Sequence, residues 1–136
     1  MNQEALHGSL VLVHPALTVD PANAQGKVAV VTYDRPDTNE IYVSLMDGKE
    51  AVYHPDNLLK LKDRQQIMQT LVNDGKAMPL NDFKTLYKIG TLLDRGTNKA
   101  TFDALELAAV NPGVWESALS RSRPAIEQKI ATAYTR

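Results

Sequence analysis

The amino-acid sequence predicts an α+β protein, in which a small β-barrel is followed by a compact bundle of short helices. Between residues 9 and 62 the apolar residues are mostly β-branched and lie in short runs separated by Pro, Gly, Asn and Asp. From residue 63 onwards the apolar residues recur at the spacing of amphipathic helices. The 136 residues suffice for one domain or two very small ones.

The first half contains short segments with the composition of β-strands. Asp47-Gly48 is typical of a two-residue hairpin, because both central positions of a type I′ turn need a positive φ. Short strands joined by tight turns, and too few for a sandwich, favour a small and strongly bent barrel. The five expected strands are "SLVLV" (9–13), "KVAVVTYD" (27–34), "IYVSLM" (41–46), "KEAVYH" (49–54) and "LLKLK" (58–62).

The order of motifs in this half resembles that of SH3-like and Tudor-like small barrels. "VHP", "GKVAVV", "YVSLMDGKEAVY" and "NLLKL" follow one another as in the Tudor-like modules of bacterial repair helicases and transcription–repair coupling factors. The resemblance covers about two-fifths of the chain and implies a five-stranded barrel over about residues 9–62, within a first domain of residues 1–62. Members of that group bind other proteins, notably RNA polymerase. The segment "ALTVDPANAQ" before Gly26 departs from their pattern, which tends to have a glycine-rich link there.

The register of the expected hairpin yields a candidate binding surface. If Asp47 and Gly48 form the turn, Tyr42 lies opposite Tyr53, and the two rings share the outer face with Met46. The core face would then carry Ile41, Val43, Leu45 and Val52.

Aromatic and Met side chains suit protein contacts, so the hairpin predicts a binding face with Tyr42, Tyr53 and Met46 at its centre. An acidic rim of Asp34, Asp47 and Glu50 would favour a basic partner segment. Two alternatives remain open at this point. The tyrosine pair could serve only to stabilise the hairpin, or the C-terminal helices could cover the face with Phe102 or Trp115.

Residues 63–136 predict four or five short helices that pack against the barrel, since no flexible linker separates the halves. Asp63 and Gln66 form a capping-box pattern, and Gly90 within the second helix indicates close helix packing. The expected helices begin near Asp63, Asn81, Thr97 or Asn98, Asn111-Pro112, and Pro124, and Gly75 and Gly96 end the first two.

Charge and composition argue against several classes of partner. Residues 1–62 carry five basic and eight acidic residues (net −3), whereas residues 63–136 carry ten and eight (net +2). Neither half is a basic field of the kind that binds nucleic acid. The absence of cysteine favours a reducing compartment. The first apolar run is too short for a signal or a membrane span, so we expect a cytoplasmic protein without a membrane partner.

The sequence offers no recognisable catalytic arrangement. It has no cysteine nucleophile, no Gly-x-Ser-x-Gly elbow and no phosphate-binding glycine loop. Two of the three histidines, His14 and His54, precede proline in expected turns rather than forming a ligand pair. We therefore expect a non-enzymatic protein-interaction module without cofactor or metal, whose partner is unknown. The alternative is a nucleic-acid or transcription accessory protein, although Asp103 and Glu106 would repel phosphates from the third helix.

Overall fold

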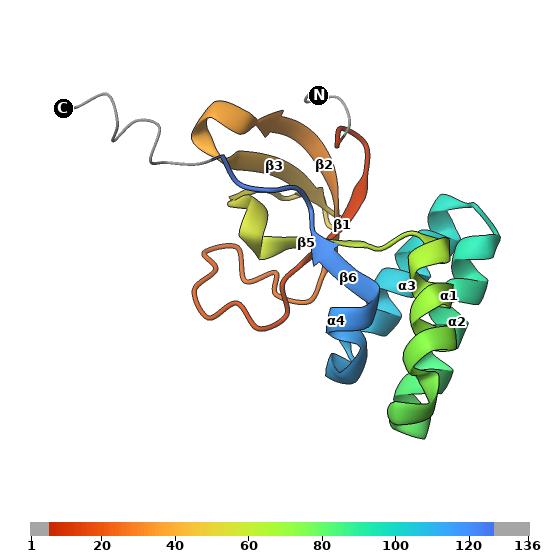
Figure 1. Ribbon diagram of the computed structural model, residues 1–136. Helices are drawn as coiled ribbons and strands as arrows, with labels where there is room; N and C mark the ends of the chain where they lie inside the picture. The colour runs from red at the N-terminus through yellow and green to blue at the C-terminus, as the bar shows by residue number, and fades with distance from the viewer. Residues whose placement is uncertain (1–5, 127–136) are drawn as a thin grey trace.

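The computed structural model describes residues 6–126, which form a mixed α+β fold with the longer helices on one side of a sheet (Figure 1). The sheet is antiparallel and six-stranded, in the order β4-β3-β2-β1-β5-β6. Its strands are β1 (Leu10–Val13), β2 (Val28–Arg35), β3 (Glu40–Leu45), β4 (Glu50–Tyr53), β5 (Leu58–Leu61) and β6 (Leu119–Arg121). The α-helices of these residues are α1 (Arg64–Asp74), α2 (Leu80–Asp94), α3 (Asn98–Ala109) and α4 (Trp115–Ala118).

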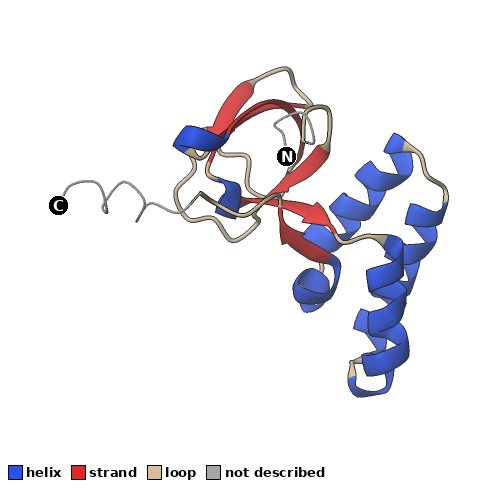
Figure 2. Ribbon diagram, turned by 45° about the horizontal axis from the view of Figure 1, so that its top comes forward, coloured by secondary structure: helices blue, strands red, loops and turns tan. Residues whose placement is uncertain are grey.

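All five predicted strands form, and the α+β class is confirmed. The first strand pairs with both β2 and β5, so the chain curls back on itself (Figure 2). The sheet nevertheless remains open, with β4 at one edge and β6 at the other. The predicted five-stranded barrel is therefore not observed as a closed structure, and the sheet has a sixth strand that the sequence did not reveal.

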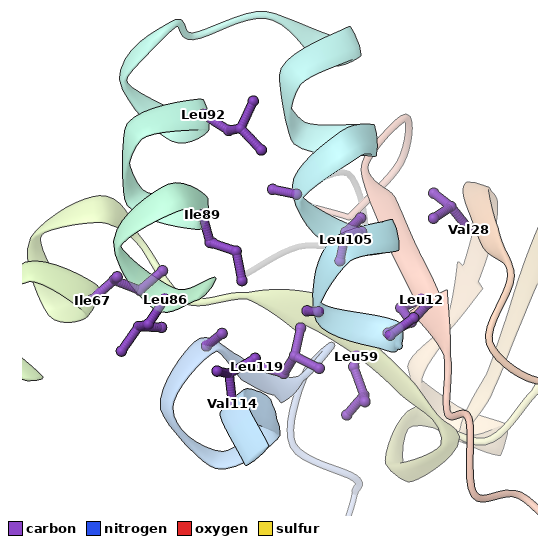
Figure 3. Close-up of a cluster of buried hydrophobic side chains, with 14 of the residues drawn as sticks. Leu12, Val28, Leu59, Ile67, Leu86, Ile89, Leu92, Leu105, Val114 and Leu119 are labelled. Atoms are coloured by element: carbon purple, nitrogen blue, oxygen red, sulfur yellow. The ribbon is translucent and has the colours of Figure 1, made fainter. Parts of the chain in front are cut away.

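The sheet separates two apolar cores, because successive side chains of a strand point to opposite faces. Val11 and Val13 of β1 point into the inner core, which lies within the curve of the sheet. Leu12 points to the outer face, where it joins residues of the helices (Figure 3). The helices and the sheet therefore share a core, as the absence of a linker predicted.

The predicted helix signals are mostly confirmed. Asp63 and Gln66 form the capping box of α1, and the side chain of Thr97 accepts a hydrogen bond from the backbone N–H of Ala100 at the start of α3. Gly90 lies against α1, where an added Cβ would be 3.2 Å from Sδ of Met68. The predicted start of α2 at Asn81 is slightly wrong, because the helix begins at Leu80 directly after Pro79.

The largest difference from the prediction lies in the chain segment after α3. The fourth helix has only four residues, and the chain then returns to the sheet as β6, which pairs with β5. The segment "RSRP", whose proline predicts a break between two helices, instead begins within β6 and continues past it. The predicted last helix from about Pro124 lies largely outside the described residues. The division into two domains at residue 62 stays a prediction.

Candidate binding surface

The hairpin register differs by one residue from the predicted one. Tyr42 lies opposite Val52, and Ile41 lies opposite Tyr53. The turn has three residues rather than two, since the backbone N–H of Leu45 donates to the carbonyl oxygen of Lys49 over 2.8 Å. Gly48 has a φ of +91°, but Asp47 does not have the positive φ that a type I′ turn requires.

A shift of one residue moves every side chain of β4 to the other face of the sheet. Val52 is therefore exposed, whereas Tyr53 is buried in the inner core with Ile41 and Val43. The predicted pairing of Tyr42 with Tyr53 on the outer face is wrong for this reason.

The structure places a different aromatic pair on the outer face. Tyr33 of β2 lies opposite Tyr42 of β3, and the two ring centroids are 5.8 Å apart. Tyr33 is 50 % exposed, Val52 on β4 is 46 % exposed, and Tyr42 between them is half-buried. We call these three residues, Tyr33, Tyr42 and Val52, the aromatic surface.

A β-bulge in β2 creates this pair. Val31 lies opposite Val43, but the next paired residue of β2 is Tyr33, opposite Tyr42. Thr32 is the extra residue, and its hydroxyl donates a hydrogen bond to the carbonyl oxygen of Tyr42 over 3.2 Å. The sequence shows no strong local signal for this bulge, so the exposure of Tyr33 was not predicted.

The other predicted binding residues are not brought together. Glu50 is exposed on β4 beside the aromatic surface, opposite Ser44. Met46 and Asp47 lie at the tip of the hairpin, where they line a cleft of about 350 Å³ together with Phe102 and Glu106 of α3. The predicted face is thus divided among the aromatic surface, the hairpin tip and the inner core.

The predicted acidic rim also changes, because Asp34 is 3 % exposed and cannot belong to it. Its carboxylate accepts hydrogen bonds from Nε of Arg123 at 3.1 and 2.9 Å and from Nη2 at 2.8 Å. Glu50 and the half-buried Glu40 remain as acidic groups near the aromatic surface, and Glu40 lies 3.5 Å from the hydroxyl of Tyr42.

Arg123 belongs to a segment that begins at the last residue of β6, which we call the C-terminal strap (residues 121–126). Ser122 donates its backbone N–H to Leu58 and its hydroxyl to the carbonyl oxygen of Pro55. At its end, Ile126 and the side chain of Asn39 exchange two hydrogen bonds of 2.8 and 3.2 Å. The strap therefore runs from β5 to the turn between β2 and β3.

Among residues 6–126, helices α1–α4 do not cover the aromatic surface. The apolar residues of α3 pack on β1, β5 and the start of β2, where Leu12, Val28 and Leu59 form the outer part of the core (Figure 3). Trp115 lies elsewhere, donating from Nε1 to the carbonyl oxygen of Ala108, with its ring edge-on to His14. The alternative in which Phe102 or Trp115 covers Tyr42 is therefore wrong.

The histidines of the two His-Pro pairs stabilise turns, as the sequence predicted. Nδ1 of His14 accepts a hydrogen bond from the backbone N–H of Ala16, and Nδ1 of His54 accepts one from the backbone N–H of Asp56.

Residues 6–126 contain no cluster of three or more acidic or imidazole side chains that could hold a metal ion. None of the helices in that range combines the length and the apolar composition needed to cross a bilayer.

The chain has no significant match among protein-family models, curated proteins or solved structures. Residues 6–126 define a mixed α+β fold with an open antiparallel sheet, whose outer face packs against the helices at β1, β5 and the start of β2.

Proposed function

We propose that this protein is a non-catalytic protein-interaction module, and that the aromatic surface binds its partner. The observation that carries the proposal is the exposure of Tyr33 and Val52 beside Tyr42 on the part of the sheet that the helices leave open. Tyrosine is enriched among the residues that dominate binding energy in protein interfaces. A contiguous patch of exposed apolar and aromatic side chains is typical of an interaction site.

The edge strand β4, which carries Val52 of the aromatic surface, favours a partner segment in an extended conformation. The Leu45–Lys49 pair is hydrogen-bonded, so the alternation along the ladder points the backbone N–H and C=O groups of Glu50 and Val52 away from β3. An extended chain can pair with such an edge. Glu40 and Glu50 near the aromatic surface favour a partner segment that carries Lys or Arg.

The same proposal includes the fold type: we propose that strands β1 to β5 form a variant of the SH3-like or Tudor-like barrel. Their curled arrangement supports this assignment. The meander of four strands is completed by β5, which pairs with β1 after a 3₁₀ turn at Pro55–Asn57. Modules of that kind bind proteins, in agreement with the role proposed for the aromatic surface. A cytoplasmic location, the absence of cofactors and a partner still to be identified belong to this proposal.

The test is affinity capture from the native lysate with matched variants. The wild-type protein and Tyr87→Ala, which changes another exposed tyrosine on α2, should retain the same partner. Tyr33→Ala and Val52→Ala should each weaken its binding at least about tenfold. Equal affinity of all four proteins for every captured partner would refute the aromatic surface as the site. A ligand that proves to be DNA or RNA, with affinity falling steeply as salt rises, would support the nucleic-acid alternative instead.

A further inference from the structure

The geometry points to Arg123 as a positioning residue for the aromatic surface. We propose that its ion pair with Asp34 selects the bulged form of β2, in which Tyr33 faces outward beside Tyr42. The meaning of this inference for binding rests on the proposed function, but the inference itself concerns the conformation of β2 and can be tested without a partner.

The bulge decides which residues of β2 face outward. Regular pairing beyond Val31 would place Thr32 opposite Tyr42, Tyr33 opposite Ile41, and Asp34 at the next, outward position. The observed pairs are instead Tyr33 with Tyr42 and Asp34 with Ile41. The bulge therefore exchanges the two side chains, turning the ring of Tyr33 towards solvent and the carboxylate of Asp34 towards the inner core.

Neither residue prefers this exchange by itself. A carboxylate opposite the fully buried Ile41 is unfavourable unless a partner compensates its charge and its hydrogen bonds. A tyrosine ring that remains half exposed gains less from the hydrophobic effect than a ring in the core. Regular pairing would bury the ring and expose the carboxylate, with the repulsion between Asp34 and the opposing Glu40 as its main cost. The bulged form therefore depends on a third group that compensates the buried carboxylate.

Arg123 supplies the missing interactions. Its guanidinium engages both carboxylate oxygens of Asp34 through Nε and Nη2, a two-point geometry that lysine cannot reproduce. The arginine side chain is itself only 15 % exposed, so water screens the pair little. The hydrogen bond from Thr32 to Tyr42 completes the bulge but lies on the exposed side and carries no charge.

The strap holds Arg123 in place independently of Asp34. Ser122 on one side is bound to Leu58 and Pro55, and Ile126 on the other side is bound to Asn39. The arginine is therefore presented to β2 by a segment anchored at both ends. Because the strap continues from α4 and β6, Arg123 links the helical segment to β2 beside the aromatic surface.

The experiment compares Arg123→Gln with Arg121→Gln, which removes the other strap arginine and its exposed 2.8 Å ion pair with Asp56. NMR follows the ring-to-ring nuclear Overhauser effect of Tyr33 and Tyr42, and hydrogen exchange of the β2 amides after Val31. Arg123→Gln should lose the ring contact, and the set of protected amides after Val31 should shift by one residue as the regular pairing forms. Arg121→Gln should retain both properties of the wild type.

A rescue variant separates positioning from a merely structural role. Asp34→Val combined with Arg123→Gln removes the buried charge, so Tyr33 and Tyr42 should regain their contact although Arg123 is absent. A folded Arg123→Gln protein that keeps the ring contact would overturn the proposal. If Arg123→Gln does not fold, the double variant decides: a folded protein with the contact supports the proposal. The same variant unfolded, or folded without the contact, refutes it.

Discussion

The hydroxyl of Tyr53 lies 3.0 and 2.9 Å from the two carboxylate oxygens of Asp20, a residue in the loop between β1 and β2. The same carboxylate accepts hydrogen bonds from the backbone N–H groups of Ala22 and Ala24. One side chain thus orders the loop and ties it to β4. Burial and the hydrogen bond and charge of Asp20 together raise the pKa of Tyr53 above its ordinary value.

Tyr53→Phe should lower the free energy of unfolding by about 1.5–3 kcal/mol, because it removes a hydrogen bond to a charged acceptor. Asp20→Ala should cost more, since the backbone N–H groups of the loop lose their acceptor as well. Urea denaturation measures both effects. Tyr87→Phe, at a tyrosine that is 55 % exposed, is the control and should change stability by less than about 0.5 kcal/mol.

The pKa of Tyr53 also predicts a pH dependence. Above about pH 10 the tyrosine of the unfolded chain ionises while Tyr53 in the folded protein keeps its proton, so the unfolded state binds fewer protons. The free energy of unfolding should then fall as pH rises, by up to about 1.4 kcal/mol per pH unit from this residue. Tyr53→Phe should have a flatter profile between about pH 9 and pH 11. Parallel profiles of the two proteins would contradict the assignment.

Alanine substitutions in the hairpin distinguish the observed register from the one that a two-residue turn predicts. Tyr53→Ala should cost about 3–5 kcal/mol, as expected for a large buried side chain. Val52→Ala should cost less than about 1 kcal/mol, because Val52 faces solvent. The alternative register reverses this order. Thermal and urea unfolding of the two variants therefore decides between them directly.

The contact between α1 and α2 at Gly90 predicts a steep dependence on side-chain size. Gly90→Ala should remain within about 1 kcal/mol of the wild type, because better helix propensity offsets a tight contact that the flexible Met68 can relieve. Gly90→Leu should lower stability by about 1–3 kcal/mol by overfilling the same space. A leucine variant as stable as the alanine variant would show that the helices are not closely packed there.

Local signals predicted the helices well and the strands in outline. The capping box at Asp63, the cap at Thr97 and the glycine contact at Gly90 all depend on residues a few positions apart or on a single backbone position. Such features can be read from the sequence because the residues that cause them are neighbours.

The binding surface could be predicted only in part, because its geometry depends on distant residues. The choice between a two-residue and a three-residue turn moved Tyr53 from the surface to the core, although the Asp47-Gly48 pair is compatible with both. The exposure of Tyr33 depends on Asp34 and on Arg123, 89 residues later. No local pattern in β2 reveals that pairing.

The return of the chain at β6 makes the whole helical segment an insertion within a β-hairpin. Leu61 pairs with Leu119, and the backbone N–H of Lys62 donates to Ala118, so the insertion begins and ends at neighbouring positions. Closing so long a loop costs conformational entropy unless the loop is already compact. We therefore expect β6 to pair with β5 only after the helices have formed.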